Sequence, residues 1–295
     1  MKKILFKGSG VAVITPFKNG VVDYDSFKKI LNFQIENGTQ AIIVCGTTGE
    51  SATLSDKEKI SLISCAVEHV NKRVPIIAGT GSYDTAHAAK LSKEAQSAGA
   101  DGLLVVTPYY NMTTQNGLCS HFFSIADGVD IPIIVYNVPS RTGLNILPET
   151  YAKLAAHENI NASKEANRSV GALARTFAAV GDSMNVYCGN DDEIVPFMAL
   201  GALGVISVMA NPAPRETQNI CELFFAGRIG ESARLQASMT NLCDALFRET
   251  SPAPVKHAMK LLGYGNGELR LPLVDIEEKN REFLAKAMTK AGILK

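Results

Sequence analysis

The sequence has no excess of charge of either sign. Lysine plus arginine number 29, as do aspartate plus glutamate, so the formal net charge is zero at neutral pH. A protein that binds nucleic acid needs surplus cations to neutralise phosphates, and this chain supplies none. We therefore expect a small-molecule partner and no nucleic acid.

Long apolar runs are also missing. The longest, such as 41–45 and 131–136, fall far short of the roughly 20 residues that a membrane helix needs, so no membrane partner is expected. The first residues lack the apolar stretch and cleavage site of a signal peptide. The six cysteines form no Cys-x-x-Cys pair and mostly have apolar neighbours, which is typical of reduced core thiols. These features predict a cytoplasmic protein.

Short runs rich in valine and isoleucine recur along the chain, and segments with helical spacing separate them. The runs are 11–14, 41–45, 75–78, 102–106, 131–136, 160–163, 184–188 and 205–208. Near-continuous apolar strands with helices between them indicate the α/β class and a parallel sheet, and eight units match a closed (β/α)8, or TIM, barrel. An open doubly wound sheet is the alternative, but no Gly-x-Gly-x-x-Gly follows the first run.

Local signals refine two of these units. Ser55 and Glu58 have the spacing of a capping box and predict the start of a helix. The sixth strand is weak because Asn159, Asn161 and Ser163 are expected to face the helix layer.

The strand pattern stops after residue 210. Helical spacing continues over 216–227, 231–247, 253–262 and 276–291. We therefore predict a barrel in residues 1–210 that carries the active site, followed by barrel-closing and C-terminal helices in residues 211–295.

Polar residues gather directly after the predicted strands, where barrel enzymes build their active sites. The segments are Gly-Thr-Thr-Gly-Glu-Ser at 46–51, Thr-Pro-Tyr-Tyr-Asn at 107–111, Tyr-Asn-Val-Pro-Ser-Arg-Thr-Gly at 136–143 and Lys-Glu at 164–165. The histidines fall in helical segments, so the ligand cluster of a metal-dependent aldolase is not predicted and no metal is expected.

Lys164 is the lysine that ends a predicted strand, and a buried amine there could act as a nucleophile. Its ordinary pKa of about 10.4 leaves well under 1% neutral at pH 7. Burial and a nearby cation such as Arg141 would both lower that pKa, as in Schiff-base lysines. The alternatives are a lysine paired with a carboxylate or one directed to solvent.

The neighbouring polar residues suggest roles but leave alternatives open. Tyr136 ends the adjacent strand and is placed to move protons. Thr47 and Thr48 lie on a glycine-flanked loop that could hold a carboxylate or link phenols. Tyr110 fits a proton relay and an interface aromatic equally well.

Two further polar features are ambiguous on their own. Arg141 suits bidentate binding of a carboxylate, but it could also cap a helix or pair at the surface. The run Asn-Asp-Asp-Glu at 190–193 resembles a carboxylate site, although its place at a helix start favours capping.

Taken together, these motifs resemble the dihydrodipicolinate synthase family, within the pyruvate-dependent Schiff-base aldolases that include N-acetylneuraminate lyase. The resemblance covers essentially the whole chain and is most specific in 46–51, 107–111, 136–143 and 164–166. It implies a lyase that condenses pyruvate with aspartate 4-semialdehyde into a six-membered heterocycle, the committed step toward diaminopimelate and lysine. It implies no external cofactor.

The resemblance also implies residue roles. Lys164 would form an imine with pyruvate, and Tyr136, Thr47 and Tyr110 would form a proton relay in which Tyr110 crosses a tight dimer interface. Two such dimers would form a homotetramer.

The same resemblance implies how the substrates are held. Thr48 would contact the pyruvate carboxylate, and Arg141 would hold the carboxylate of the semialdehyde. Gly189 and Ile206 match backbone positions that line the site.

The chain departs from the family pattern in two places. Ala162-Ser163 precedes the lysine where Gly-Ile is usual. Lysine-inhibited relatives carry histidine, asparagine and glutamate where this chain has Asp56, Lys59, Tyr83 and His87. A cation at Lys59 would oppose a cationic effector, so we expect weak or absent inhibition by lysine.

Two rival functions remain at this point. One is a lyase or aldolase of the same superfamily that cleaves N-acetylneuraminate or a 2-keto-3-deoxy sugar acid. The other is a non-catalytic barrel that senses a keto acid, although Tyr136 and Lys164 together argue for catalysis.

Overall fold

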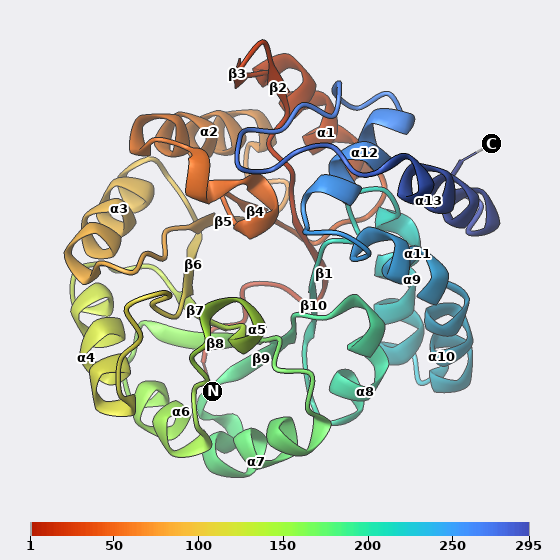
Figure 1. Ribbon diagram of the computed structural model, residues 1–295. Helices are drawn as coiled ribbons and strands as arrows, with labels where there is room; N and C mark the ends of the chain where they lie inside the picture. The colour runs from red at the N-terminus through yellow and green to blue at the C-terminus, as the bar shows by residue number, and fades with distance from the viewer. Residues whose placement is uncertain (1, 295) are drawn as a thin grey trace.

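The computed structural model describes residues 2–294, which form a closed barrel of eight parallel strands (Figure 1). In chain order the strands are β1 (Gly8–Ala12), β4 (Ala41–Val44), β5 (Ile76–Gly79), β6 (Gly102–Val106), β7 (Ile133–Asn137), β8 (Ile160–Glu165), β9 (Asn185–Cys188) and β10 (Gly204–Ser207). β10 pairs with β1 and closes the ring. The predicted TIM barrel is confirmed, and the open sheet is excluded. β1 begins and ends earlier than the apolar run at 11–14 suggested.

Helices surround the barrel as an outer layer (Figure 1). They are α1 (Tyr24–Glu36), α2 (Asp56–Val70), α3 (Thr85–Ser97), α4 (Gln115–Ala126), α6 (Pro148–Ala155), α7 (Val170–Val180), α8 (Ile194–Ala199) and α9 (Pro214–Phe225). The capping box of Ser55 and Glu58 opens α2, as predicted. A small hairpin of β2 (Phe17–Lys18) and β3 (Val21–Val22), which the sequence patterns did not indicate, precedes α1.

The apolar strand residues divide between two cores. One core lies between the strands and the helices, and a smaller one fills the barrel interior with side chains such as Ile43, Ile134 and Tyr187. Because each strand is buried on both faces, its sequence is a nearly continuous run of apolar residues. This explains why the strands were recognisable in the sequence.

A bulge in β8 accounts for the polarity of the weak sixth strand. Ile133 of β7 pairs with Ile160, but Ile134 pairs with Ala162, so Asn161 is an extra residue in the ladder. Asn161 therefore lies outside the regular alternation on which the expectation for this strand was based. A one-residue bulge reverses the alternation of side chains. Ile160 consequently packs in the outer core, whereas Ala162, Lys164 and Ala166 point into the barrel.

Four helices follow α9 in the described part of the chain: α10 (Ile229–Ser238), α11 (Thr240–Leu246), α12 (Ala253–Leu261) and α13 (Glu278–Lys290). The single helix expected over 231–247 is thus wrong, since the chain turns at Met239. The turn lets α10 pack on α9 while α11 packs on α13. The division at residue 210 stays a prediction. Within residues 2–294, none of the helices has the length and apolar composition to cross a bilayer.

Candidate active site

A cavity of about 190 Å³ lies at the carboxyl ends of the strands, close to the short helix α5 (Pro139–Thr142), which lies over the middle of the ring in Figure 1. The residues predicted for the site that line it are Thr47, Thr48, Tyr136, Arg141, Lys164 and Gly189. They come from four different strand ends, as the barrel topology requires.

Lys164 lies at the centre of this arrangement, and the bulge in β8 turns it into the barrel. It is 5% exposed, so it does not point to solvent. Burial is the main reason that the pKa of its amine is lowered to about 8; Arg141 acts in the same direction, while Asp191 and Cys188 oppose the shift. With a pKa of about 8, roughly a tenth of the amine is neutral at pH 7. The side chain is therefore suited to nucleophilic attack.

Tyr136 is the partner of Lys164 across the β7–β8 ladder. The Lys164 Nζ lies 4.3 Å from the centroid of the Tyr136 ring. Burial raises the pKa of the phenol to about 12, and Arg141 opposes this shift. The phenol is consequently protonated at neutral pH and can donate a proton to an oxygen that develops negative charge near the amine.

The threonines lie in a 3-10 turn, η1 (Thr47–Gly49), directly after β4. Thr48 is 4% exposed, whereas Thr47 is exposed beside the cavity. The Thr15 hydroxyl donates to the Gly49 carbonyl at 2.7 Å, which ties the turn to the end of β1. The turn is therefore a fixed part of the barrel rim.

Gly189 follows β9 at a point where two strand ends approach closely. A Cβ atom there would lie 2.8 Å from the Cβ of Ala166 and 3.0 Å from the carbonyl oxygen of Glu165. Glycine therefore lets the chain after β9 pack against the end of β8, which carries the lysine.

Two predicted residues, Tyr110 and Ile206, do not line the cavity, and Arg141 lines it from an exposed position. Arg141 is exposed at the end of α5, and its Nη2 donates to the Ser251 carbonyl at 3.3 Å. Tyr110 is 95% exposed and does not line the cavity. Ile206 is fully buried in the barrel interior, beneath the lining residues.

Asp191, in the acidic run at 190–193, lies next to the cavity-lining Asn190 and has a role other than the one expected. Capping was expected for this acidic run, but the Asp191 Oδ2 accepts hydrogen bonds from the backbone N–H groups of Val208 at 3.0 Å and Met209 at 2.8 Å. Burial raises the pKa of its carboxyl group. Asp191 thus joins the end of β9 to the end of β10, a role that depends on contacts between distant segments.

Glu165 forms a second buried network behind the lysine. The Tyr151 hydroxyl donates to its Oε2 at 2.7 Å, and the Asn137 Nδ2 donates to its Oε1 at 2.7 Å. Burial raises the pKa of Glu165 to about 7, although both hydrogen bonds oppose the shift. Because neighbouring strand residues point to opposite faces, this network fixes the end of β8 from the helix side.

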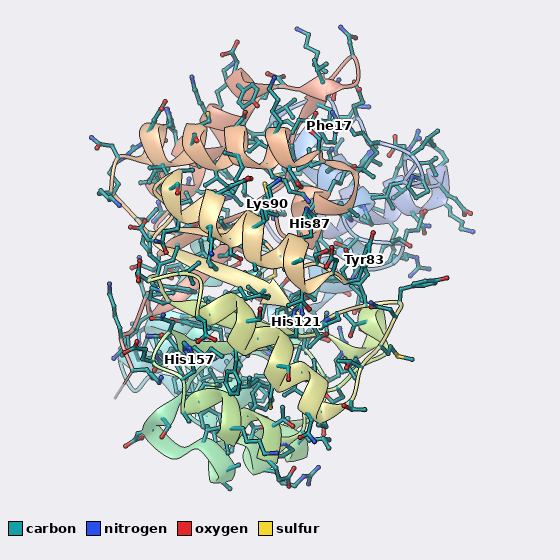
Figure 2. The ribbon with its side chains drawn as sticks, turned by 90° about the vertical axis from the view of Figure 1, so that its left-hand side faces the viewer. Phe17, Tyr83, His87, Lys90, His121 and His157 are labelled. Carbon is teal, nitrogen blue, oxygen red and sulfur yellow. The ribbon has the colours of Figure 1, made fainter. Side chains whose placement is uncertain are left out.

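The histidines lie away from the cavity. Figure 2 shows His87 and His121 on the outer helices, and His157 at the lower left, apart from His87. His157 falls in the turn after α6, not in a helix as expected. Burial lowers the pKa of His121 to about 4. Among residues 2–294, no group of three or more histidine, cysteine, aspartate or glutamate side chains is arranged to hold a metal ion.

Comparisons with known proteins agree with this geometry. A family model described as "Dihydrodipicolinate synthetase family" matches residues 5–291. The 4-hydroxy-tetrahydrodipicolinate synthase of Clostridium novyi is 51% identical over 96% of this chain and 96% of its own. That of Caldicellulosiruptor bescii is 52% identical over 98% of each chain. The crystal structure of dihydrodipicolinate synthase from Thermotoga maritima superposes with a TM-score of 0.97 at 43% identity, and covers 99% of this chain and 100% of that chain.

Proposed function

The chain belongs to the dihydrodipicolinate synthetase family, and from this premise we propose that its cavity joins pyruvate to L-aspartate 4-semialdehyde through an imine on Lys164. The product is 4-hydroxy-tetrahydrodipicolinate, the compound for which the relatives are named. The enzyme is a Schiff-base lyase of lysine and diaminopimelate biosynthesis. The observation that carries the proposal is the buried Lys164 amine beside Tyr136 in the barrel-end cavity.

The first half of the reaction uses the amine of Lys164. Its neutral form attacks the keto carbon of pyruvate, and the carbinolamine loses its oxygen as water to give an imine. Tyr136, whose ring centroid lies 4.3 Å from the Lys164 Nζ, is assigned the proton transfers to and from that departing oxygen. Thr48, buried in the cavity wall, is assigned to the pyruvate carboxylate.

The second half forms the carbon–carbon bond. Loss of a proton from the pyruvate methyl group converts the imine into an enamine, whose carbon attacks the aldehyde carbon of the semialdehyde. The aldehyde oxygen takes a proton and becomes a hydroxyl group. The amino group of the semialdehyde then attacks the imine carbon, which closes the ring and releases Lys164. Arg141 is assigned to the carboxylate of the semialdehyde, at the cavity entrance.

A second copy of the chain would complete the proton relay. Tyr110 is 95% exposed and has a backbone φ of 72°, which is unusual for a residue other than glycine. Met112, two residues further along the chain, is 55% exposed. Tyr83 is also 55% exposed, and its carbonyl accepts a hydrogen bond from the Nδ2 of Asn111, the residue after Tyr110. Such an exposed aromatic surface fits a tight dimer, and a homotetramer of two dimers is the assembly we propose. A fully active monomer in light scattering would contradict it.

The proposed compartment is the cytoplasm. All six cysteines are free thiols, and five of them are buried. Such a set fits a reducing compartment.

The decisive assay compares substrates. We expect turnover of L-aspartate 4-semialdehyde with pyruvate, and no cleavage of N-acetylneuraminate or 2-keto-3-deoxy sugar acids. Lys164→Ala should lower turnover by several orders of magnitude while the circular dichroism spectrum is unchanged, and Tyr136→Phe should lose most activity. Faster cleavage of a sugar acid than condensation would replace this function with that of the sugar-acid lyases.

A further inference from the structure

The cavity lining carries three cationic side chains, those of Lys164, Arg141 and Arg168. Among the described residues that line it, none is an aspartate or a glutamate. Lys164 and Arg141 have roles in the proposed reaction. Arg168 has none so far, although it follows the reactive lysine in the same strand-end loop.

The backbone at Arg168 is strained. Its φ is 54°, in the left-handed region that residues other than glycine seldom adopt. The neighbours on both sides are committed to local hydrogen bonds, since the Asn167 Oδ1 accepts from the Ser169 N–H at 3.0 Å and the Ser169 hydroxyl caps α7. A strained residue that persists in a cavity wall points to a functional reason for its side chain.

The guanidinium of Arg168 is also held in place. Its Nη1 donates to the Asp192 Oδ2 at 2.8 Å, and its side chain remains 56% exposed. Asp192 is itself fixed, because the Gln236 Nε2 donates to its carbonyl oxygen. Within residues 2–294, the Nε and Nη2 groups of Arg168 have no such partner. A guanidinium offers five N–H donors in a planar fork, so donors remain for a ligand.

Arg168 and Arg141 therefore both line the cavity, and they follow two neighbouring strands, β8 and β7. We propose that Arg168 is a second entrance guanidinium, which binds the carboxylate of the aldehyde substrate together with Arg141 and so selects a carboxylate-bearing aldehyde. The inference rests on the proposed function, because it assigns part of the specificity of that same site.

The test uses substitutions that separate charge from backbone strain. Arg168→Gly removes the charge and relieves the left-handed strain, Arg168→Gln removes the charge but keeps the strain, and Arg168→Lys keeps the charge. Arg175→Gln is the control, because it removes one cation from exposed α7 outside the cavity lining. Each full-length variant is assayed for kcat and for the KM of both substrates.

We expect the KM for aspartate semialdehyde to rise about tenfold in Arg168→Gly and Arg168→Gln, as for the loss of one partly exposed charge-assisted hydrogen bond. Arg168→Lys should recover most of this loss. The kcat, the KM for pyruvate and the borohydride trapping of the pyruvate imine should stay within about twofold of the parent, as should every constant of Arg175→Gln.

Three results would overturn the inference. If the KM for the semialdehyde is unchanged in both uncharged variants while imine trapping is intact, Arg168 does not bind the aldehyde substrate. The proposed function is not affected by that result. If the KM for the semialdehyde rises equally in Arg175→Gln, the effect comes from the change in net charge and not from the position of Arg168. Absence of imine and of turnover in the parent enzyme removes the proposed function, and this inference with it.

Discussion

A buried ion pair connects the active-site turn to the C-terminal helices. Glu50 follows η1 with a left-handed backbone, and its carboxylate pairs with the ammonium of Lys256 on α12. The two side chains are 0% and 1% exposed. The other carboxylate oxygen accepts from the Arg270 N–H at 3.1 Å, and the Lys256 Nζ lies 4.2 Å from the centroid of the Phe17 ring.

The perturbation is Lys256→Met, which keeps an unbranched chain of similar length and removes the charge. Glu50 would then stay buried with one backbone N–H as its remaining partner. Removal of one member of a buried pair destabilises a protein by about 3–5 kcal/mol, because the other charge is left unpaired. The double variant Glu50→Gln/Lys256→Met leaves no unpaired charge, so most of that loss should be recovered. Displacement of the turn should also lower kcat/KM by roughly 10- to 100-fold in the single variant.

The assay is urea unfolding at one fixed protein concentration, together with steady-state kinetics. Lys260→Met is the control, since Lys260 is exposed on the same helix, and we expect it to change stability by no more than about 0.5 kcal/mol. A loss below about 1 kcal/mol in Lys256→Met, or a double variant no more stable than the single one, would refute the argument.

Three further predictions concern titration and regulation. The rate of imine formation with pyruvate should rise with pH and level off above about 8, because burial lowers the pKa of the Lys164 amine and the neutral form attacks; a rise that continues to pH 10 would contradict this. Burial raises the pKa of Glu165 from 4.5 to about 7, so the unfolded state loses its proton first, and this group lowers stability as pH rises between those values. Relative to the parent, Glu165→Gln should therefore gain about 3 kcal/mol from pH 4.5 to pH 7 in urea unfolding, and a pH-independent difference would argue against it. Lysine should inhibit weakly or not at all, since Lys59, whose Nζ lies 3.8 Å from the Asp56 carboxylate, adds a cation at a position that the family resemblance assigns to the effector; strong inhibition at sub-millimolar lysine in a steady-state assay would refute this.

The barrel could be predicted from the sequence because its determinants are local. Strands buried on both faces give apolar runs, and the residues after each run must meet at one end of the ring. Lys164, Tyr136 and the Thr47–Thr48 turn were found in this way, and the structure brings them to one cavity. The position of a residue at a strand end thus carried most of the information about the site.

The remaining features depend on contacts between distant segments. The bulge at Asn161 is visible only in the pairing of β7 with β8, and the pairing of Glu50 with Lys256 spans most of the chain. Asp191 resembled a capping residue because its true partners lie after β10. Arg168 was not among the predicted site residues, because backbone strain leaves no mark in a single sequence.

The central claim is that Lys164 bonds covalently to pyruvate during turnover. The most direct measurement is borohydride reduction of the enzyme with pyruvate, followed by mass spectrometry of the digested protein. We expect one added reduced pyruvate, on the peptide that contains Lys164, and none in Lys164→Ala. A modification on another lysine, or no modification in an enzyme that turns over, would contradict the account.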